Sequence, residues 1–355
     1  MSMNRSFGSE DPVFKDKAPE DFKVLAIETS CDETSSAVVR GGRVILSNVV
    51  SSQIDVHRKF GGVVPEIASR KHVEMLIPVV DEAIKNAGMK VEDVDAVAST
   101  YGPGLVGALL VGLSGAKAVA FALGVPFIGV NHVEGHIYAN MLSHEELEPP
   151  FICLTVSGGH TELMLMKEHG DYITLGRTRD DAAGEAFDKV ARVMGLPYPG
   201  GPFIDELSKK GDPHAVKFPK AHVAENELDF SFSGIKTAVI NYLHSESQRG
   251  NALKFEDVAA SFQMSVVDAL VERACRAVEL YNVRRVCLSG GVSANSMLRK
   301  RLKDAGEKSG FEVYYPPLSL CTDNAAMVAC AAHYRLMKGE RSPLSLNAVA
   351  GARIV

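Results

Sequence analysis

The stretch that decides the fold spans residues 23–40 and has the sequence KVLAIETSCDETSSAVVR. It begins with an apolar run at 23–27, passes through a polar turn at 28–34, and continues into a second apolar run at 36–40. Two glycines and a third apolar run, rich in β-branched residues, follow at 41–50. A two-residue glycine turn between such runs is typical of a β-hairpin. The sequence therefore predicts three consecutive strands, with a polar turn between the first and the second.

The same pattern begins again at residue 151. An apolar run at 151–156 leads into a short polar turn at 157–160, and further runs at 161–167 and 172–177 follow. Each half then continues with a helix, a strand and another helix, although the residues of the two halves are barely similar. We therefore expect an α/β protein with two duplicated βββαβα-type domains. Two like domains that face each other would bring both polar turns to one central cleft.

The repeat sets the expected domain boundaries. Residues 1–22 lack an apolar segment and are interpreted as a flexible leader. The first domain is expected over 23–150, together with a C-terminal helix at about 325–355. The second is expected over 151–324. It would include a loop/helix insertion at about 196–256. This segment is rich in Gly, Pro, Lys and His and weakly periodic, so much of it is predicted to be loop.

Composition and charge exclude two broad classes of protein. Hydrophobic residues make up 46% and charged residues 23% of the 355 residues, which excludes a mainly disordered chain. The net charge of -6 excludes a bulk polycation, so nucleic acid would have to be bound by local basic clusters or through a partner. The six cysteines form no C-x-x-C pair, which favours reduced thiols in a cytoplasmic protein. The apolar run at 105–123 contains Lys117 and is predicted to be a buried helix, not a membrane span.

A pair of histidines is the sharpest chemical signal. His132 and His136 follow a predicted strand and are four residues apart, so on a helix they share one face and suit a divalent metal. A third ligand should be a carboxylate or an imidazole from elsewhere, and Asp323 is one candidate. Taken alone, Asp323 is explained more simply as part of a helix N-cap. Two histidines and one carboxylate would suit Zn²⁺ and Fe²⁺ equally well.

Three glycine-rich turns could bind a ligand. Residues 102–107 match G-x-G-x-x-G, but the next strand ends without the acidic residue of a dinucleotide site, so a turn for close helix packing is favoured. The turns at 157–160 and 289–295 each contain a glycine pair directly after an apolar strand. Such turns let the backbone approach a ligand and offer free N–H groups to anions. The turns at 157–160 and 289–295, together with the polar turn at 28–34, predict a shared nucleotide cleft.

With these motifs in place, the chain closely resembles the TsaD family of tRNA N6-adenosine threonylcarbamoyltransferases, from about residue 23 to the C-terminus. The matching motifs lie at residues 28–34, 61–66, 102–105, 132–136, 156–160, 184–189 and 290–295. The resemblance implies the actin/Hsp70/sugar-kinase (ASKHA) fold. It also implies transfer of a threonylcarbamoyl group from threonylcarbamoyl-AMP to N6 of adenosine 37 in tRNAs that read ANN codons.

The resemblance further implies a set of site residues and partners. The family's metal ligands fall on His132, His136 and Asp323, which would hold one Fe²⁺ or Zn²⁺ ion per subunit. Bacterial members work with two partners, a TsaB-type paralogue and a TsaE-type ATPase, so a cytoplasmic hetero-oligomer is expected. The family's substrate-binding positions fall on Thr155, Val156, Ser157, Gly158, Gly159, Asp188, Gly201 and Asn295.

The sequence leaves open which residue acts as a base, and it allows two other functions. No covalent nucleophile is evident, and Asp32, His160 and Asp188 are the candidates for a general base. A small-molecule kinase of the same fold is one alternative, although a kinase of this fold needs no His-x3-His pair. A non-catalytic assembly subunit is another. A metalloprotease is disfavoured, because the residue after His132 is Val133, where a zincin motif has its glutamate.

Overall fold

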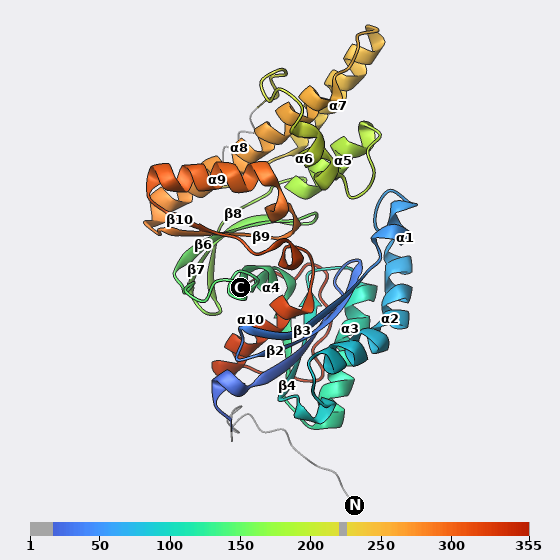
Figure 1. The fold of residues 1–355 in the computed structure, drawn as a ribbon, viewed down its shortest axis with the longest axis vertical. Coiled ribbons are helices and arrows are strands. Elements are labelled where there is room, and N and C mark those ends of the chain that lie inside the picture. The colour runs from blue at the N-terminus through green and yellow to red at the C-terminus, as the bar shows by residue number, and fades with distance from the viewer. Residues whose placement is uncertain (1–16, 220–225, 355) are drawn as a thin grey trace, which may run out of the picture.

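The computed structural model describes residues 17–219 and 226–354, and the predicted duplication of strands and helices is confirmed (Figure 1). Of the expected leader, residues 1–16 lie outside the described residues, Pro19–Asp21 form a 3-10 turn, and Phe22 is buried.

The first half contains one five-stranded sheet with the strand order β3-β2-β1-β4-β5. β1 is antiparallel to β2 and parallel to β4. Its strands are β1 (Lys23–Glu28), β2 (Glu33–Arg40), β3 (Val44–Ser52), β4 (Ala96–Gly102) and β5 (Phe127–Asn131). Its helices are α1 (Ile54–Arg58), α2 (Pro65–Asn86), α3 (Val106–Leu123) and α4 (His132–Tyr138).

The second half repeats this arrangement in a sheet of order β10-β9-β6-β7-β8. Its first strand, β6, is again antiparallel to the next strand along the chain and parallel to a later one, β9. The strands are β6 (Phe151–Val156), β7 (Thr161–Glu168), β8 (Asp171–Arg177), β9 (Arg285–Ser289) and β10 (Glu312–Tyr314). The helices are α5 (Ala183–Val193), α6 (Gly200–Ser208), α7 (Ser233–Gln248), α8 (Phe255–Tyr281) and α9 (Ser296–Ser309). The last helix, α10 (Ala325–Met337), returns to pack against the first sheet.

The predicted insertion at residues 196–256 contains two helices as well as loops. α6 and α7 both lie within this segment, and α6 packs against α5 and α8. The sequence concealed α6 because the helix begins Gly-Gly-Pro, a combination that usually marks a turn. Residues 220–225 of the segment lie outside the described residues.

The hairpin predicted at the glycine pair is present. Gly41 and Gly42 have φ values of 57° and 72°, a region that favours glycine. A Cβ atom at Gly42 would lie 2.5 Å from the ring of His333 on α10, so this turn also requires a residue without a side chain. The hairpin therefore packs directly against the last helix of the chain.

Two helices, α4 and α10, form a layer between the two sheets (Figure 1). The core cluster around them takes residues from β1, β2, β4 and β5 on one side and from β6, β7 and β9 on the other. Every residue of α10 from Ala325 to His333 is buried, and most of them are small, which lets α4 and the first sheet approach the helix closely. At Gly135 a Cβ atom would lie 3.3 Å from the side chain of Met327, so α4 and α10 also touch each other.

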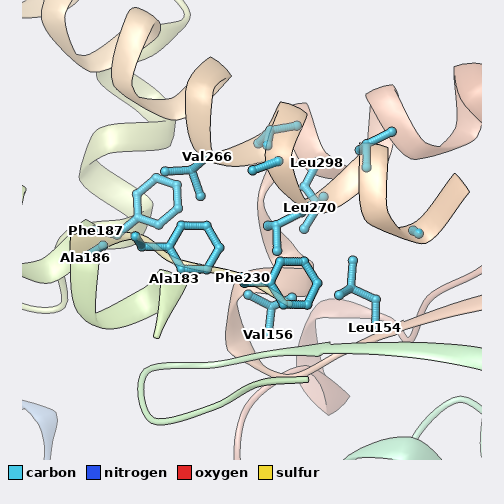
Figure 2. Packing of buried hydrophobic residues seen from close by; sticks show 14 of the residues in the cluster. Leu154, Val156, Ala183, Ala186, Phe187, Phe230, Val266, Leu270 and Leu298 are labelled. Carbon is cyan, nitrogen blue, oxygen red and sulfur yellow. The ribbon is translucent and has the colours of Figure 1, made fainter. Parts of the chain in front are cut away.

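The strands alternate between this middle layer and the outer helices. In β6, Phe151 and Cys153 face the middle layer, whereas Leu154 and Val156 belong to the cluster with α5, α8 and α9. Figure 2 shows Leu154 and Val156 beneath Phe187 of α5 and Leu270 of α8. This is the period of two expected of a strand, and both of its faces are buried.

The apolar helix α3 packs against α2 and β4. Within the described part of the chain, it is the one helix long and apolar enough to cross a membrane, with a mean hydropathy of 1.9 over its 18 residues. One face of it is exposed and apolar, with Val106, Leu110 and Phe121 between 40% and 69% exposed.

Arg43 ties the first hairpin to the segment that connects the two halves. Its guanidinium donates hydrogen bonds to the phenol oxygen of Tyr334 at 2.7 Å and to the carbonyl oxygens of His144 (3.0 Å), Glu145 (3.1 Å) and Leu147 (3.2 Å). The Arg43 side chain is only 19% exposed. If it were removed, water could replace few of its hydrogen bonds to these carbonyl oxygens.

We expect Arg43→Ala to lower the free energy of unfolding by about 2–4 kcal/mol, because it removes several partly buried charge-assisted hydrogen bonds at once. Urea unfolding would measure this, with Arg40→Ala as the control, since Arg40 is exposed on β2. A loss for Arg43→Ala no larger than that for Arg40→Ala would contradict the structural role of this arginine.

Candidate active site at the junction of the two halves

The histidine pair lies where β5 becomes α4. Asn131 ends the strand and caps the helix, because its side chain accepts hydrogen bonds from the backbone N–H groups of Val133 and Glu134. His132 and His136 therefore occupy adjacent turns of one helix face, and their ring centroids are 4.7 Å apart. Both side chains are buried.

Asp323 reaches this pair from the loop before α10. Its Oδ1 atom lies 3.1 Å from Nε2 of His136 and 3.5 Å from Nε2 of His132. The interpretation of Asp323 as the cap of α10 is wrong, because the side chain of Asn324 caps this helix by accepting from the N–H of Met327. The Asp323 carboxylate is thus directed at the histidines and is not needed by the helix.

The donor atoms of these three residues fit a divalent metal ion. One ligand atom from each residue lies within 4.8 Å of the others. Nδ1 and Nε2 of His136 are buried and, within the described residues, have no hydrogen-bond partner of good geometry. Buried polar atoms rarely stay unpaired, so an Nε2 atom that points at a second imidazole and a carboxylate is well explained by a metal between them. Two nitrogen donors and one oxygen donor would leave further coordination positions open.

Glu28, at the end of β1, orients one of the two histidines. Its carboxylate is fully buried and faces Nδ1 of His132 at 3.2 Å. It also accepts hydrogen bonds from the backbone N–H of Ser30 and from the hydroxyl of Thr100, which hold it in place. A proton on Nδ1 shared with Glu28 leaves Nε2 of His132 free for a metal.

The charges at the junction influence one another strongly. Burial alone would raise the pKa of Asp323, but His132 and His136 lower it below its usual range. Burial alone would lower the pKa of His132, but the carboxylates of Asp323 and Glu28 raise it to about 9. Burial, together with the neighbouring histidines His132 and His136, lowers the pKa of His160 to about 4. Asp323 is therefore ionised and His160 neutral at neutral pH.

The second half contributes the turn at residues 157–160. The His160 ring lies 6.4 Å from that of His132, so the β6–β7 turn stands beside the histidine pair. Ser157 stabilises the turn, because its hydroxyl accepts a hydrogen bond from the N–H of His160. A Cβ atom at Gly158 or Gly159 would meet nothing within 4 Å, which leaves open space over this backbone.

Thr155 and Val156, which precede the turn, are fully buried. The Thr155 hydroxyl is paired with that of Ser289 at 2.8 Å, and the Val156 side chain lies in the core. The backbone of Val156 also lies next to the glycine turn at 289–295, since a Cβ atom at Gly290 would lie 2.5 Å from its carbonyl oxygen. Close packing of two turns thus explains the glycine at 290.

The remaining predicted ligand residues lie on elements around these turns. The Asp188 carboxylate accepts a hydrogen bond from the N–H of Gly200 at 2.6 Å, and burial raises its pKa. Gly201 follows directly and has open space at its Cβ position. Asn295 caps α9 with its side-chain oxygen and donates from Nδ2 to Gln263, 2.8 Å away.

Asp32 connects the first half to this region. It is 7% exposed. Burial raises the pKa of Glu33 beside it and that of Asp188 in the second half, and the charge of Asp32 adds to both shifts. Asp32 of the first half thus lies within electrostatic range of Asp188 of the second, and His160 lies beside His132. Glu28 belongs to the polar turn at 28–34, but its contact with His132 and that of Gln263 with Asn295 join residues far apart along the chain, which no local pattern predicts.

The fold places the chain in the actin/Hsp70/sugar-kinase-like class. Full-length HypF, solved in a phosphate- and nucleotide-bound form, aligns with a TM-score of 0.61 and 16% identity, covering 90% of this chain and 47% of HypF. The activator of 2-hydroxyisocaproyl-CoA dehydratase from Clostridium difficile aligns with a TM-score of 0.50 and 14% identity, covering 89% of this chain and 96% of the activator.

The family is more specific than the fold. Residues 44–330 match the family described as TsaD, tRNA N6-adenosine threonylcarbamoyltransferase. A curated relative of that name from Clostridium botulinum is 56% identical over 335 residues, which covers 94% of this chain and 98% of the relative. The chain therefore belongs to the tRNA N6-adenosine threonylcarbamoyltransferase family and is a tRNA-modifying transferase. This finding disfavours the kinase and the non-catalytic subunit as alternatives.

The role of the contact between Glu28 and His132 can be tested by substitution. We expect Glu28→Gln, which keeps the shape but removes the charge, to weaken binding of Zn²⁺ about tenfold or more, because the carboxylate orients His132 and strengthens its donor nitrogen. Competition with a chromophoric chelator measures the affinity.

The matched control is Asp229→Asn, since Asp229 is also a buried carboxylate, 2% exposed, but is hydrogen-bonded to Arg177 and Arg179. It should leave metal affinity unchanged. Equal affinities for Glu28→Gln and the wild type would argue against the orienting role.

Proposed function

We propose that the protein transfers a threonylcarbamoyl group from threonylcarbamoyl-AMP to N6 of adenosine 37 in tRNAs that read ANN codons. One Fe²⁺ or Zn²⁺ ion, bound by His132, His136 and Asp323, would assist the transfer. The observation that carries the proposal is the cluster of these three donors beside the open glycine turn at residues 157–160.

The open glycine positions support binding of the adenylate part of the substrate. Gly158, Gly159 and Gly201 each leave space over exposed or half-exposed backbone, and backbone N–H groups suit a phosphate. Thr155 and Val156 would contribute through the backbone, because their side chains are buried. Ser157, Asp188 and Asn295 would complete the site at its edge.

The reaction forms a bond between N6 of adenosine and the carbamoyl carbon, and breaks the bond from that carbon to the phosphate oxygen of AMP. The bound metal would polarise the carbonyl or stabilise negative charge on the leaving phosphate. N6 of adenosine is a weak nucleophile, so correct positioning should contribute much of the rate. A base must accept the N6 proton, and we place His160 first among the candidates, ahead of Asp32 and Asp188, because its neutral ring lies beside His132.

A reconstituted assay tests this proposal. The protein is incubated with its partner proteins, threonine, bicarbonate, ATP and unmodified tRNA, and the nucleosides are then analysed. Absence of threonylcarbamoyladenosine would reject the proposal, provided that the Clostridium botulinum relative is active in the same mixture.

In that assay we expect His132→Ala and Asp323→Ala to lower the rate at least about 100-fold, because each removes a metal ligand from the reacting centre. His214→Ala is the control, since His214 is exposed. Treatment with a chelator should have the same effect, and added Fe²⁺ or Zn²⁺ should reverse it. Full activity of both ligand variants would contradict the metal's role.

We also propose that the protein works with a TsaB-type paralogue and a TsaE-type ATPase in the cytoplasm, where its tRNA substrate lies. The exposed apolar side chains of α2 and α3 support a docking surface for the paralogue. Val73 and Ile77 on α2 are 65% and 70% exposed, and α3, which packs against α2, has an exposed apolar face of its own. Apolar side chains gathered on neighbouring helices are typical of a protein interface.

Ile77→Lys should therefore abolish co-purification with the paralogue and leave the melting temperature of the isolated protein unchanged, because Ile77 is exposed in it. The control is Val44→Lys, at an exposed apolar position on β3. Retention of the complex by Ile77→Lys would rule out this surface.

A further inference from the structure

Arg299, near the start of α9, joins two loops of the second half. Its Nε atom donates to the carbonyl oxygen of Ser293 at 2.5 Å. Its Nη2 atom donates to the carbonyl oxygen of Pro316 at 3.0 Å and to Sγ of Cys321 at 3.2 Å. The guanidinium also lies over the ring of Tyr315, 4.5 Å from its centroid. The side chain is half-buried and bonded on two edges.

The two loops carry residues of different parts of the proposed site. Ser293 belongs to the glycine turn after β9, which ends at the proposed substrate residue Asn295. Pro316 and Cys321 belong to the loop between β10 and α10, which ends at the proposed metal ligand Asp323. Arg299 is therefore bonded to both loops, at Ser293, two residues before Asn295, and at Cys321, two residues before Asp323.

The geometry of the contact requires arginine. A guanidinium is a planar fork whose nitrogens can donate in two directions while its face stacks on an aromatic ring. A lysine ammonium at the same place could bond to one loop but could not make the three contacts in one plane. Nε and Nη2 of Arg299 both donate to these two loops, so the guanidinium acts as a bridge between them.

We propose that Arg299 is a positioning residue. It holds the turn that ends at Asn295 and the loop that carries Asp323 in one fixed arrangement, so that the adenylate and the metal ion bind to a preformed site. This proposal rests on the function proposed above. Without the guanidinium, each loop would have to be ordered when its ligand binds, and binding would weaken for both ligands.

The experiment compares the wild type with Arg299→Met, Arg299→Lys and Arg301→Met. Arg301 is on the same helix but forms a surface ion pair with Asp268, so it is a matched control. Co²⁺ binding is followed by its visible absorption spectrum and AMP binding by calorimetry, each with the other ligand absent. The melting temperature of each variant is measured in parallel.

We expect Arg299→Met to weaken Co²⁺ and AMP about tenfold each and to change the Co²⁺ spectrum, while Arg301→Met behaves like the wild type. Arg299→Lys should not restore wild-type affinities, because it keeps the charge but not the fork. If Arg299→Met does not fold, the Co²⁺ and AMP affinities of Arg299→Lys test the proposal instead.

Wild-type affinity for both ligands in the Arg299 variants, with only the melting temperature lowered, would overturn the proposal, since a merely stabilising role gives that result. Loss of one affinity alone would also overturn it, because the link between the loops is what is proposed. A wild-type protein that binds neither Co²⁺ nor AMP would instead overturn the proposed function itself.

Discussion

The rest of the structure depends on the burial of α4 and α10 between the two sheets. These helices contribute apolar side chains to a core cluster shared by both halves, and small residues along α10 allow α4 and the first sheet to pack closely against it. One core cluster thereby includes strands from each half, which fixes the halves relative to each other through apolar burial. Arg43 adds polar contacts between the first hairpin, α10 and the connecting segment.

The same layer explains where the candidate active site lies. α4 begins with the histidine pair and α10 begins two residues after Asp323, so packing the two helices side by side brings their first turns together. The end of β1 adds Glu28, and the β6–β7 turn adds His160. Charges this deeply buried are tolerated because each faces an opposite charge or a hydrogen-bond donor. A metal ion between the donors would satisfy His136, whose nitrogens have no partner of good geometry among the described residues.

Most of the strands and the long helices could be predicted from the sequence, because alternation, helical periodicity and glycine turns are local signals. The glycine pair at 41 and 42 marks the hairpin where the structure has it. The positions of α6 and α7 within the insertion could not be predicted, because α6 begins with turn residues and its tertiary contacts with α5 and α8 outweigh that local preference. Asp323 was ambiguous for a similar reason. Capping and metal binding both suit a carboxylate at this point of the chain, and only the position of Asn324 shows that the cap is already supplied.

The sequence by itself determined the duplicated order of strands and helices, the histidine pair on one helix face, and the motifs that place the chain in its family. These features depend on residues close together along the chain. Only the tertiary structure decided that Asp323 meets the histidines, that Glu28 orients one of them, and that Arg299 is bonded to both loops. Each of these contacts joins distinct elements or loops. Their geometry is set by how the middle layer and the two sheets pack, which no local pattern encodes.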